Sequence, residues 1–192
     1  MDPLIFRPTD IEEMTRAFSG WQMDIVQQER GAFAGRLHSF SQLGGQVRFC
    51  SVNLNKRVFG YAHHAEGSVM FTFVECPEAC TWNGERIHPL KLFVSDANRG
   101  IDVDAGKGFV SFSVSVERNL LEKWFWEEGL PIPGNWNFSM DFKRSSIPVV
   151  ALVFKRVITN AVFRGIFDLQ SFKLPLFKLI QPVNQACPSR IY

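Results

Sequence analysis

Apolar and polar residues alternate along much of the first 116 residues, and this period of two predicts a series of short β-strands. Between 21 and 25, and again between 110 and 116, every second side chain is apolar. Turns such as Gly44-Gly45 and Trp82-Asn83-Gly84 separate these segments. About eight short strands, with a turn every dozen residues or fewer, are typical of an antiparallel sandwich or barrel.

Helical patterns flank the predicted strands. Thr9 as N-cap and Glu12 three residues later form a capping box for a short helix, which Gly20 stops. After residue 116 the period becomes helical, first in a segment that ends at Gly129 and then in a longer one capped by Ser146. A further short helix is predicted for 171–181. The pattern therefore predicts a mainly β fold with accessory α-helices.

These patterns divide the chain into three parts. Residues 1–20 form an amino-terminal segment with the capped helix, and residues 21–116 form the β-barrel. Residues 117–192 hold the helices for packing or dimerisation and a tail. A chain of 192 residues is long enough to bury a substantial core.

The composition is that of an ordinary folded protein, with 46% apolar and 21% charged residues. Its nineteen phenylalanines fit either a filled barrel or a greasy pocket. The formal charge of +2 comes with scattered basic residues, which argues against a nucleic-acid-binding surface. The first residues lack a signal-peptide pattern, and the longest apolar run, 147–154, is too short for a membrane span. We therefore expect a cytoplasmic protein.

The four cysteines are Cys50, Cys76, Cys80 and Cys187. Their spacing is not that of a zinc site, and they are too few for a disulfide scaffold. We expect reduced thiols.

Several short motifs follow one another in a fixed order along the chain. They are Gly20-Trp21 after the first helix, Gly31-x-Phe33-x-Gly35-x-Leu37, Asn55-Lys56-Arg57, Trp82-Asn83-Gly84 and Gly129-Leu130-Pro131. In these motifs the chain resembles the sensor half of AraC-type bacterial transcription regulators, from about Ile11 to about Ile158.

The resemblance implies a cupin-like antiparallel β-barrel, preceded by a short helix and followed by two or three helices. It also implies a regulatory domain that needs no cofactor, binds a small and partly apolar effector in the barrel, and controls an attached DNA-binding domain. Members of the family contact DNA through two carboxy-terminal helix-turn-helix units, which this sequence, ending at Tyr192, does not contain. The chain is then either an excised regulatory half, which we favour, or a stand-alone sensor.

Two other functions stay open. A cupin-type metal-dependent enzyme would share the fold, but the sequence lacks the ligand spacing of a cupin metal site and any recognisable catalytic motif. A ligand-free dimerisation module would have a barrel filled by its own side chains. We expect no enzyme activity and no membrane contact.

The candidate ligand-binding residues lie on the predicted strands. Those expected inside the barrel are Phe33, Leu37, Phe49, Phe71, Phe73 and Phe112. Arg36 and His38 share the opposite strand face, where they would hold an anionic group if that face pointed inward; a solvated outer face is the favoured alternative. Arg48, between two apolar residues, is similarly ambiguous.

The cluster His63-His64-Ala65-Glu66 has the right residue types for a metal site. Adjacent side chains on a strand point to opposite faces, so both histidines cannot point into one barrel. We expect this cluster in an exposed loop, with no metal.

The longer carboxy-terminal helix has a broad apolar stripe. In the family that the chain resembles, helices after the barrel commonly form the contact of a homodimer. The resemblance thus implies dimerisation through Val150, Val153, Phe154, Val157 and Ile158. The alternative is that this helix is wholly buried in its own subunit.

Overall fold

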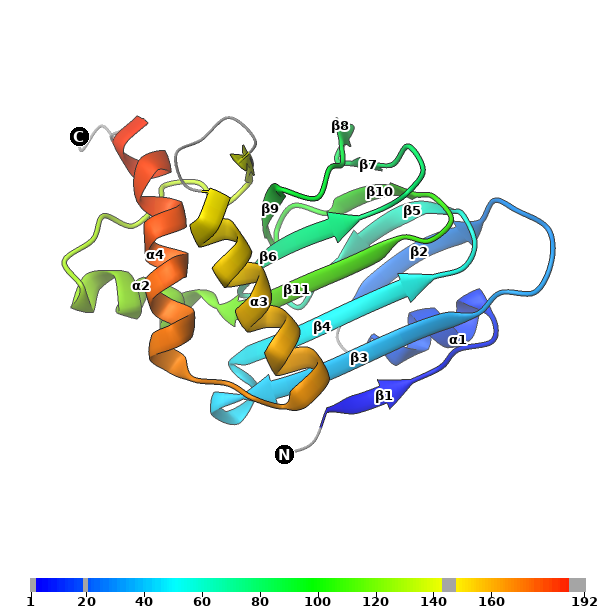
Figure 1. Ribbon diagram of the computed structural model, residues 1–192, viewed down its shortest axis with the longest axis horizontal. Helices are drawn as coiled ribbons and strands as arrows, with labels where there is room; N and C mark the ends of the chain where they lie inside the picture. Colours follow the sequence, from blue (N-terminus) through cyan, green and yellow to red (C-terminus); the bar gives the residue numbers. More distant parts are fainter. Residues whose placement is uncertain (1–2, 19–20, 143–147, 187–192) are drawn as a thin grey trace.

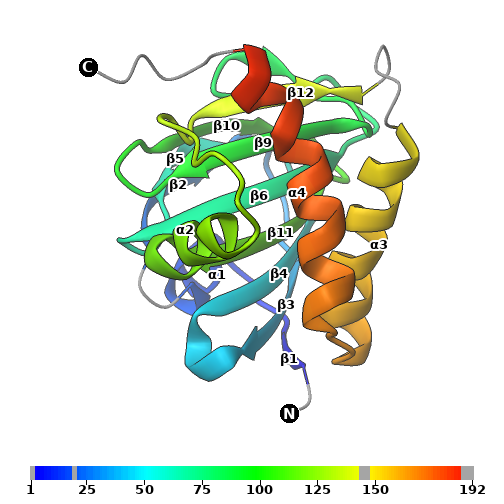
Figure 2. The same cartoon turned by 90° about the vertical axis from the view of Figure 1, so that its left-hand side faces the viewer.

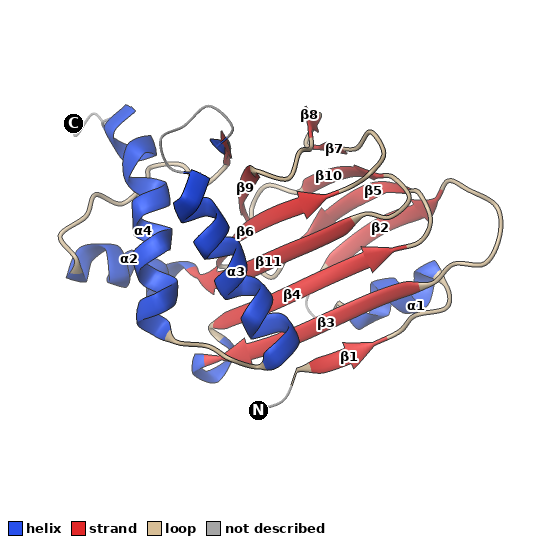
Figure 3. Cartoon of the chain, viewed as in Figure 1, coloured by secondary structure: helices blue, strands red, loops and turns tan. Residues whose placement is uncertain are grey.

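The computed structural model describes residues 3–18, 21–142 and 148–186, which form two antiparallel β-sheets with helices (Figures 1 and 3). The seven-stranded sheet has the order β1-β3-β4-β11-β6-β9-β12, and the five-stranded sheet the order β2-β5-β10-β7-β8. The strands of the large sheet are β1 (Leu4–Phe6), β3 (Gly35–Gln42), β4 (Val47–Leu54), β6 (Ser68–Glu75), β9 (Lys91–Asp96), β11 (Val110–Glu117) and β12 (Phe138–Asp141). Those of the small sheet are β2 (Gln22–Gln27), β5 (Val58–His63), β7 (Thr81–Trp82), β8 (Glu85–Arg86) and β10 (Ile101–Ala105).

Four α-helices accompany the sheets in the described part of the chain. They are α1 (Ile11–Ala17), α2 (Arg118–Glu127), α3 (Pro148–Arg164) and α4 (Leu169–Ala186). Figures 1 and 2 show α3 and α4 side by side over the outer face of the large sheet, with α1 on its other side. The prediction of a mainly β, cupin-like fold with one short helix before the barrel and two or three after it is confirmed.

The sheets and helices enclose two apolar cores. One core lies between the large sheet and α2, α3 and α4, and includes Phe71, Phe154 and Phe172. The other lies between the two sheets and includes Leu37, Met70 and Ile101. The large sheet is thus covered on both faces, which decides what lies inside the barrel.

The amino-terminal helix is capped one residue later than its sequence predicts. Asp10, not Thr9, is the N-cap, and its carboxylate accepts a hydrogen bond from the Glu13 amide at 2.6 Å. The Glu13 carboxylate in turn accepts from the Thr9 amide and hydroxyl. The pairing resembles a capping box, but Glu13 takes the role expected of Glu12.

The predicted turns are present where the backbone needs them. Asn83 and Gly84 both have positive φ, at 51° and 74°, as a tight two-residue hairpin between β7 and β8 requires. Gly129, with a φ of 63°, follows α2. Gly20, the expected stop of α1, and Ser146, the expected cap of α3, lie outside the described residues.

Helix α4 is longer than the predicted 171–181, running over 18 residues. Its sequence contains Pro175 and Pro182, which lack the amide that an interior helical position donates. Its burial against Trp124 and Phe154, through Phe172, offsets that penalty.

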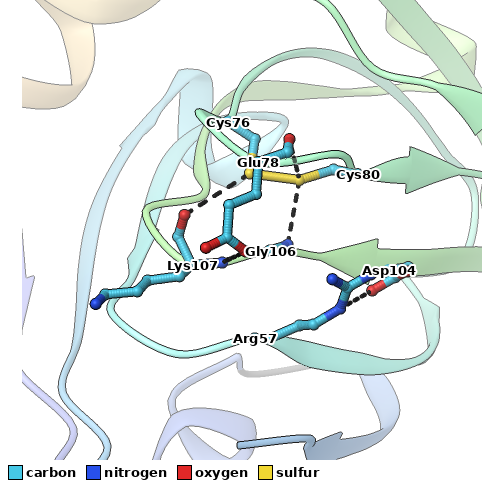
Figure 4. The surroundings of a disulfide bond; sticks show 7 residues. All are labelled: Arg57, Cys76, Glu78, Cys80, Asp104, Gly106 and Lys107. Atoms are coloured by element: carbon cyan, nitrogen blue, oxygen red, sulfur yellow. Dashed lines mark hydrogen bonds and ion pairs between the residues drawn. A yellow bond between two sulfur atoms is a disulfide. The ribbon is translucent and has the colours of Figure 1, made fainter.

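A disulfide joins Cys76, directly after β6, to Cys80, directly before β7 (Figure 4). The expectation of reduced thiols is therefore wrong for this pair, because the loop between the strands brings their Cα atoms to 6.7 Å. The Gly106 amide donates to Cys80 Sγ at 3.1 Å, and the Lys107 amide donates to Glu78 Oε2 at 3.1 Å.

The other two cysteines stand apart from this disulfide. Cys50 is free, and Cys187 lies outside the described residues.

Candidate ligand-binding cavity

A cavity of about 630 Å³ lies between the two sheets. Strands of both sheets line it, together with Leu4 and Phe6 of β1 and Met14, Ala17 and Phe18 of α1 and its end. The volume is in the range of small-molecule sites, which are usually 300–1,000 Å³. The barrel is thus not filled by its own side chains.

One wall of the cavity is polar and comes from the large sheet. Five serines form most of it, Ser39 and Ser41 on β3 and Ser111, Ser113 and Ser115 on β11. Strand register sets them in rows, because Cys50 pairs with both Ser39 and Ser113, and Arg48 pairs with both Ser41 and Ser115. A sixth serine of the lining, Ser68 at the start of β6, has its hydroxyl 2.6 Å from the Ala65 carbonyl oxygen.

The wall formed by the small sheet is apolar. Met23 and Ile25 of β2, Ala62 of β5, Val103 of β10 and Trp82 of β7 contribute to it. Gly60 lies between Ile25 and Val103 in the register, and a Cβ there would collide with the backbone of β2. The glycine therefore lets β5 and β2 approach each other closely at the cavity wall.

Among the described residues of the cavity lining, the charged ones lie at one end. They are Arg48, Glu66 and Glu117, all exposed to solvent. Arg48 Nε donates to the Gly45 carbonyl at 3.0 Å, and Glu117 Oε2 accepts from the Gln46 amide group at 2.9 Å. We call this end the mouth.

The structure brings three of the predicted ligand-binding residues to the cavity. Leu37, Arg48 and Phe49 contribute to its lining, although the Phe49 ring also contacts Phe167 and Phe172. Phe33 belongs to the core between the sheets without lining the cavity.

The expectation that Phe71, Phe73 and Phe112 lie inside the barrel is wrong. Phe71 and Phe73 contact Phe154 of α3, and Phe112 contacts Phe163 of the same helix. These rings are on the outer face of the large sheet, where α3 and α4 remove them from water. The alternation was identified correctly, but the apolar face points toward the helices.

Arg36 and His38 also lie on the outer face of the large sheet. Arg36 is exposed, as the favoured alternative expected. His38, however, is buried rather than solvated, with its ring 4.6 Å from that of Phe163. Burial, followed by the charges of Arg36 and Arg7, lowers the pKa of His38. The pair does not face the cavity.

The serines of the polar wall are the residues that sequence reasoning missed. The sequence contained an indication of them, because positions 111, 113 and 115 are all serine and this strand face therefore carries no charge. A strand face exposed to water normally carries charged residues, so an all-serine face indicates a sheltered polar surface.

His64 lies beside the cavity mouth and is buried, with 2% of its surface exposed, so the expectation of an exposed loop is wrong for it. Its Nδ1 lies 2.9 Å from the Ser68 hydroxyl, and its Nε2 lies 3.1 Å from the Ser95 carbonyl oxygen. Burial lowers the pKa of His64 to about 4. His63 is on the opposite face, against Tyr61.

Helix α3 divides the residues predicted for a dimer contact. Phe154 and Ile158 have no exposed surface, so the expectation that they contact a second copy is wrong. Val150 and Val157 are partly buried and pack against the same core. Val153 is 46% exposed. Four large apolar side chains of α3 are exposed and form what we call its open surface: Val149, Leu152, Val153 and Phe163.

Residues 3–18, 21–142 and 148–186 contain no group of three or more His, Cys, Asp or Glu side chains arranged to hold a metal ion. None of the helices within those ranges has the length and apolar character needed to span a bilayer.

In sequence, the chain matches no protein-family model and no curated protein. In structure, it is similar to the AraC-like transcriptional activator CuxR, with a TM-score of 0.55 over 96% of this chain and 69% of that chain, at 10% identity. A conserved protein of unknown function from Pseudomonas aeruginosa and vicilin from hazelnut, Corylus avellana, give TM-scores of 0.37 and 0.30, at 11% and 10% identity. They cover 60% and 89% of this chain and 56% and 51% of their own. The similarity to CuxR shows that the chain has the fold of this AraC-like regulator. The TM-scores of the other two structures are too low to support a statement about the fold.

Proposed function

We propose that this chain is the effector-sensing and dimerisation domain of an AraC-type transcription regulator. The cavity between the sheets is the observation that carries this proposal, because a 630 Å³ space with one polar and one apolar wall fits a small, partly apolar molecule. The fold shared with an AraC-like transcriptional activator supports the regulatory role. DNA contact is assigned to an attached DNA-binding unit.

The cavity lining suggests how an effector would act on distant parts of the chain. A bound molecule would contact β1 and α1 directly, through Phe6 and Met14. It would also contact β4, whose Phe49 packs on Phe167 and Phe172 at the start of α4. A ligand shifts an equilibrium only by its differential affinity, and here one arrangement of β1, α1, α3 and α4 would bind it more tightly.

The proposal includes no catalytic step. Ser68 and His64 have the contact of a nucleophile and a base, but a histidine with a pKa of about 4 is a weak base at neutral pH. Burial also raises the pKa of the Cys50 thiol to about 12, which keeps it protonated and unreactive. We expect no hydrolysis of p-nitrophenyl esters above the level of a Ser68→Ala variant; a rate that depends on Ser68 would contradict this assignment.

A thermal-shift screen tests the sensing role. Fatty acids, aromatic acids, sugars and siderophore-like molecules cover the plausible effector classes, and a true ligand raises the melting temperature saturably. The variant Ala62→Phe puts a ring into the cavity and should abolish the shift. Absence of any saturable shift, or a shift that Ala62→Phe leaves unchanged, would refute ligand sensing in this cavity.

Light scattering tests the dimer. We assign the contact to the open surface of α3, so Val153→Glu should convert a dimer to a monomer. Phe59→Glu is the matched control, because Phe59 is 47% exposed on the outer face of the small sheet. A wild-type chain that stays monomeric at high concentration, or equal effects of both variants, would contradict the assignment.

A further inference from the structure

We propose that the cavity takes an uncharged amphiphile, whose hydrogen-bonding head group lies against the serine wall and whose apolar tail fills the opposite end. This inference rests on the proposed sensing function and specifies the chemistry of its ligand. Three features of the cavity carry it: hydroxyls without partners, charges confined to the mouth, and a gradient from polar to apolar along the strands.

The serine hydroxyls are free to bind a ligand. Among the residues that the structure describes, Ser39, Ser41, Ser111 and Ser115 make no side-chain hydrogen bond. Ser113 accepts one from Thr72 at 3.0 Å, which leaves its own proton to donate. Hydroxyls both donate and accept, so the row suits hydroxyl, ester or amide groups. Ser111 and Ser113 are themselves buried, at 5% and 8% exposure.

The head group that reaches this row must be uncharged. The polar side chains along the inner wall are neutral, and the charged residues of the lining, Arg48, Glu66 and Glu117, are exposed at the mouth. Moving an ion away from water without a counter-ion costs far more free energy than moving a neutral hydrogen-bonding group. A carboxylate or an ammonium would therefore lose more solvation at Ser111 and Ser113 than it would regain.

The polarity of the wall changes along each strand. On β4 the inner residues run from Arg48 through Cys50 to Val52 and Leu54, and on β11 the serines lead back to Phe109. Beyond that end lie Val58 and Ala105 of the small sheet. The gradient places the head group near the middle of the cavity and an aliphatic or aromatic tail at the end far from the mouth.

Three probes that share a ten-carbon chain test the inference: 1-decanoylglycerol, sodium decanoate and decyltrimethylammonium, each below its aggregation threshold. Binding is measured by calorimetry and by the fluorescence of Trp21 and Trp82, which both line the cavity. We expect 1-decanoylglycerol to bind at least about tenfold more tightly than either charged probe.

Serine variants connect this preference to the wall. Ser111→Ala and Ser39→Ala, on different strands, should each weaken 1-decanoylglycerol about fivefold. Ser51→Ala is the matched control, because Ser51 is a buried serine on the outer face of β4 and should leave binding unchanged. Circular dichroism confirms that each variant is folded.

The outcomes separate this inference from the proposed function. Tighter binding of decanoate or of the ammonium probe, no binding of any of the three, or an equal effect of Ser51→Ala would overturn the uncharged amphiphile. The sensing function would still stand if the wider screen finds a ligand whose effect Ala62→Phe abolishes. If that screen also fails, both proposals fall.

Discussion

Acidification should destabilise this protein through one buried histidine beside the cavity mouth. His64 is 2% exposed, and its ring is held between the Ser68 hydroxyl and the Ser95 carbonyl oxygen. A neutral ring that donates from Nε2 to the Ser95 carbonyl oxygen has only an acceptor at Nδ1, which requires the Ser68 hydroxyl to donate to it. A proton on Nδ1 would remove that acceptor and place a charge in a site shielded from water.

The size of the effect follows from the pKa shift. The pKa of His64 falls from 6.5 in the unfolded chain to about 4 in the folded one, chiefly because the site is buried. Between these values the unfolded state binds more protons than the folded state, so the free energy of unfolding decreases as the pH falls. At 1.36 kcal/mol per pKa unit, the loss between pH 7.5 and pH 4 is about 3 kcal/mol. Above about pH 7.5 the histidine contributes almost no pH dependence, because it is then unprotonated in both states.

Urea denaturation at a series of pH values measures this loss. His64→Gln retains a donor for Ser95 but does not titrate, so the difference in stability between wild type and variant should change by about 3 kcal/mol over the range. His63→Gln, on the opposite strand face, is the control and should follow the wild type. Nuclear magnetic resonance gives the pKa of His64 directly.

One result would refute this reasoning. The Ser68 hydroxyl also lies 2.6 Å from the Ala65 carbonyl oxygen. If its proton goes there, His64 donates from both nitrogens and its charged form is retained. A measured pKa of 6.5 or above, or parallel stability curves for wild type and His64→Gln, would establish that arrangement instead.

Three further predictions concern stability. Phe154→Ala should lower the free energy of unfolding by about 3–5 kcal/mol in urea denaturation, because the ring is fully buried between α3 and the large sheet. Leu152→Ala, on the exposed side of α3, should lower it by less than about 0.5 kcal/mol. Equal losses would contradict the docking of α3. Gly60→Ala should lower the free energy of unfolding by several kcal/mol, because the added Cβ would meet the backbone of β2. Gly134→Ala has open space around the added methyl group and should leave stability unchanged. A Gly60→Ala variant as stable as the wild type would refute the close approach of β5 and β2. Reducing the disulfide between β6 and β7 should lower the free energy of unfolding by about 2 kcal/mol, because the unfolded chain is no longer constrained by the closed loop. Denaturation with and without dithiothreitol measures this loss. No change would mean that the bond does not form.

Local patterns predicted the elements well. The alternation at 21–25 became β2, the turn Trp82-Asn83-Gly84 became the β7–β8 hairpin, and the helix before Gly129 became α2. Each depends on residues that are neighbours in sequence, such as a period of two or a glycine that adopts positive φ. The short strands β1 and β12 were missed, because each is defined by pairing with a distant strand.

The sequence by itself determined which residues share a face of a strand. It placed Phe112 with Val110 and Val114, and Ser111 with Ser113, because side chains alternate along any extended strand. Only the tertiary structure decided which of those faces is inside. Helices α3 and α4 cover the large sheet and bury its aromatic face, so the serine face lines the cavity. The covering helices begin some thirty residues or more after β11, and no local pattern specifies the face on which they pack.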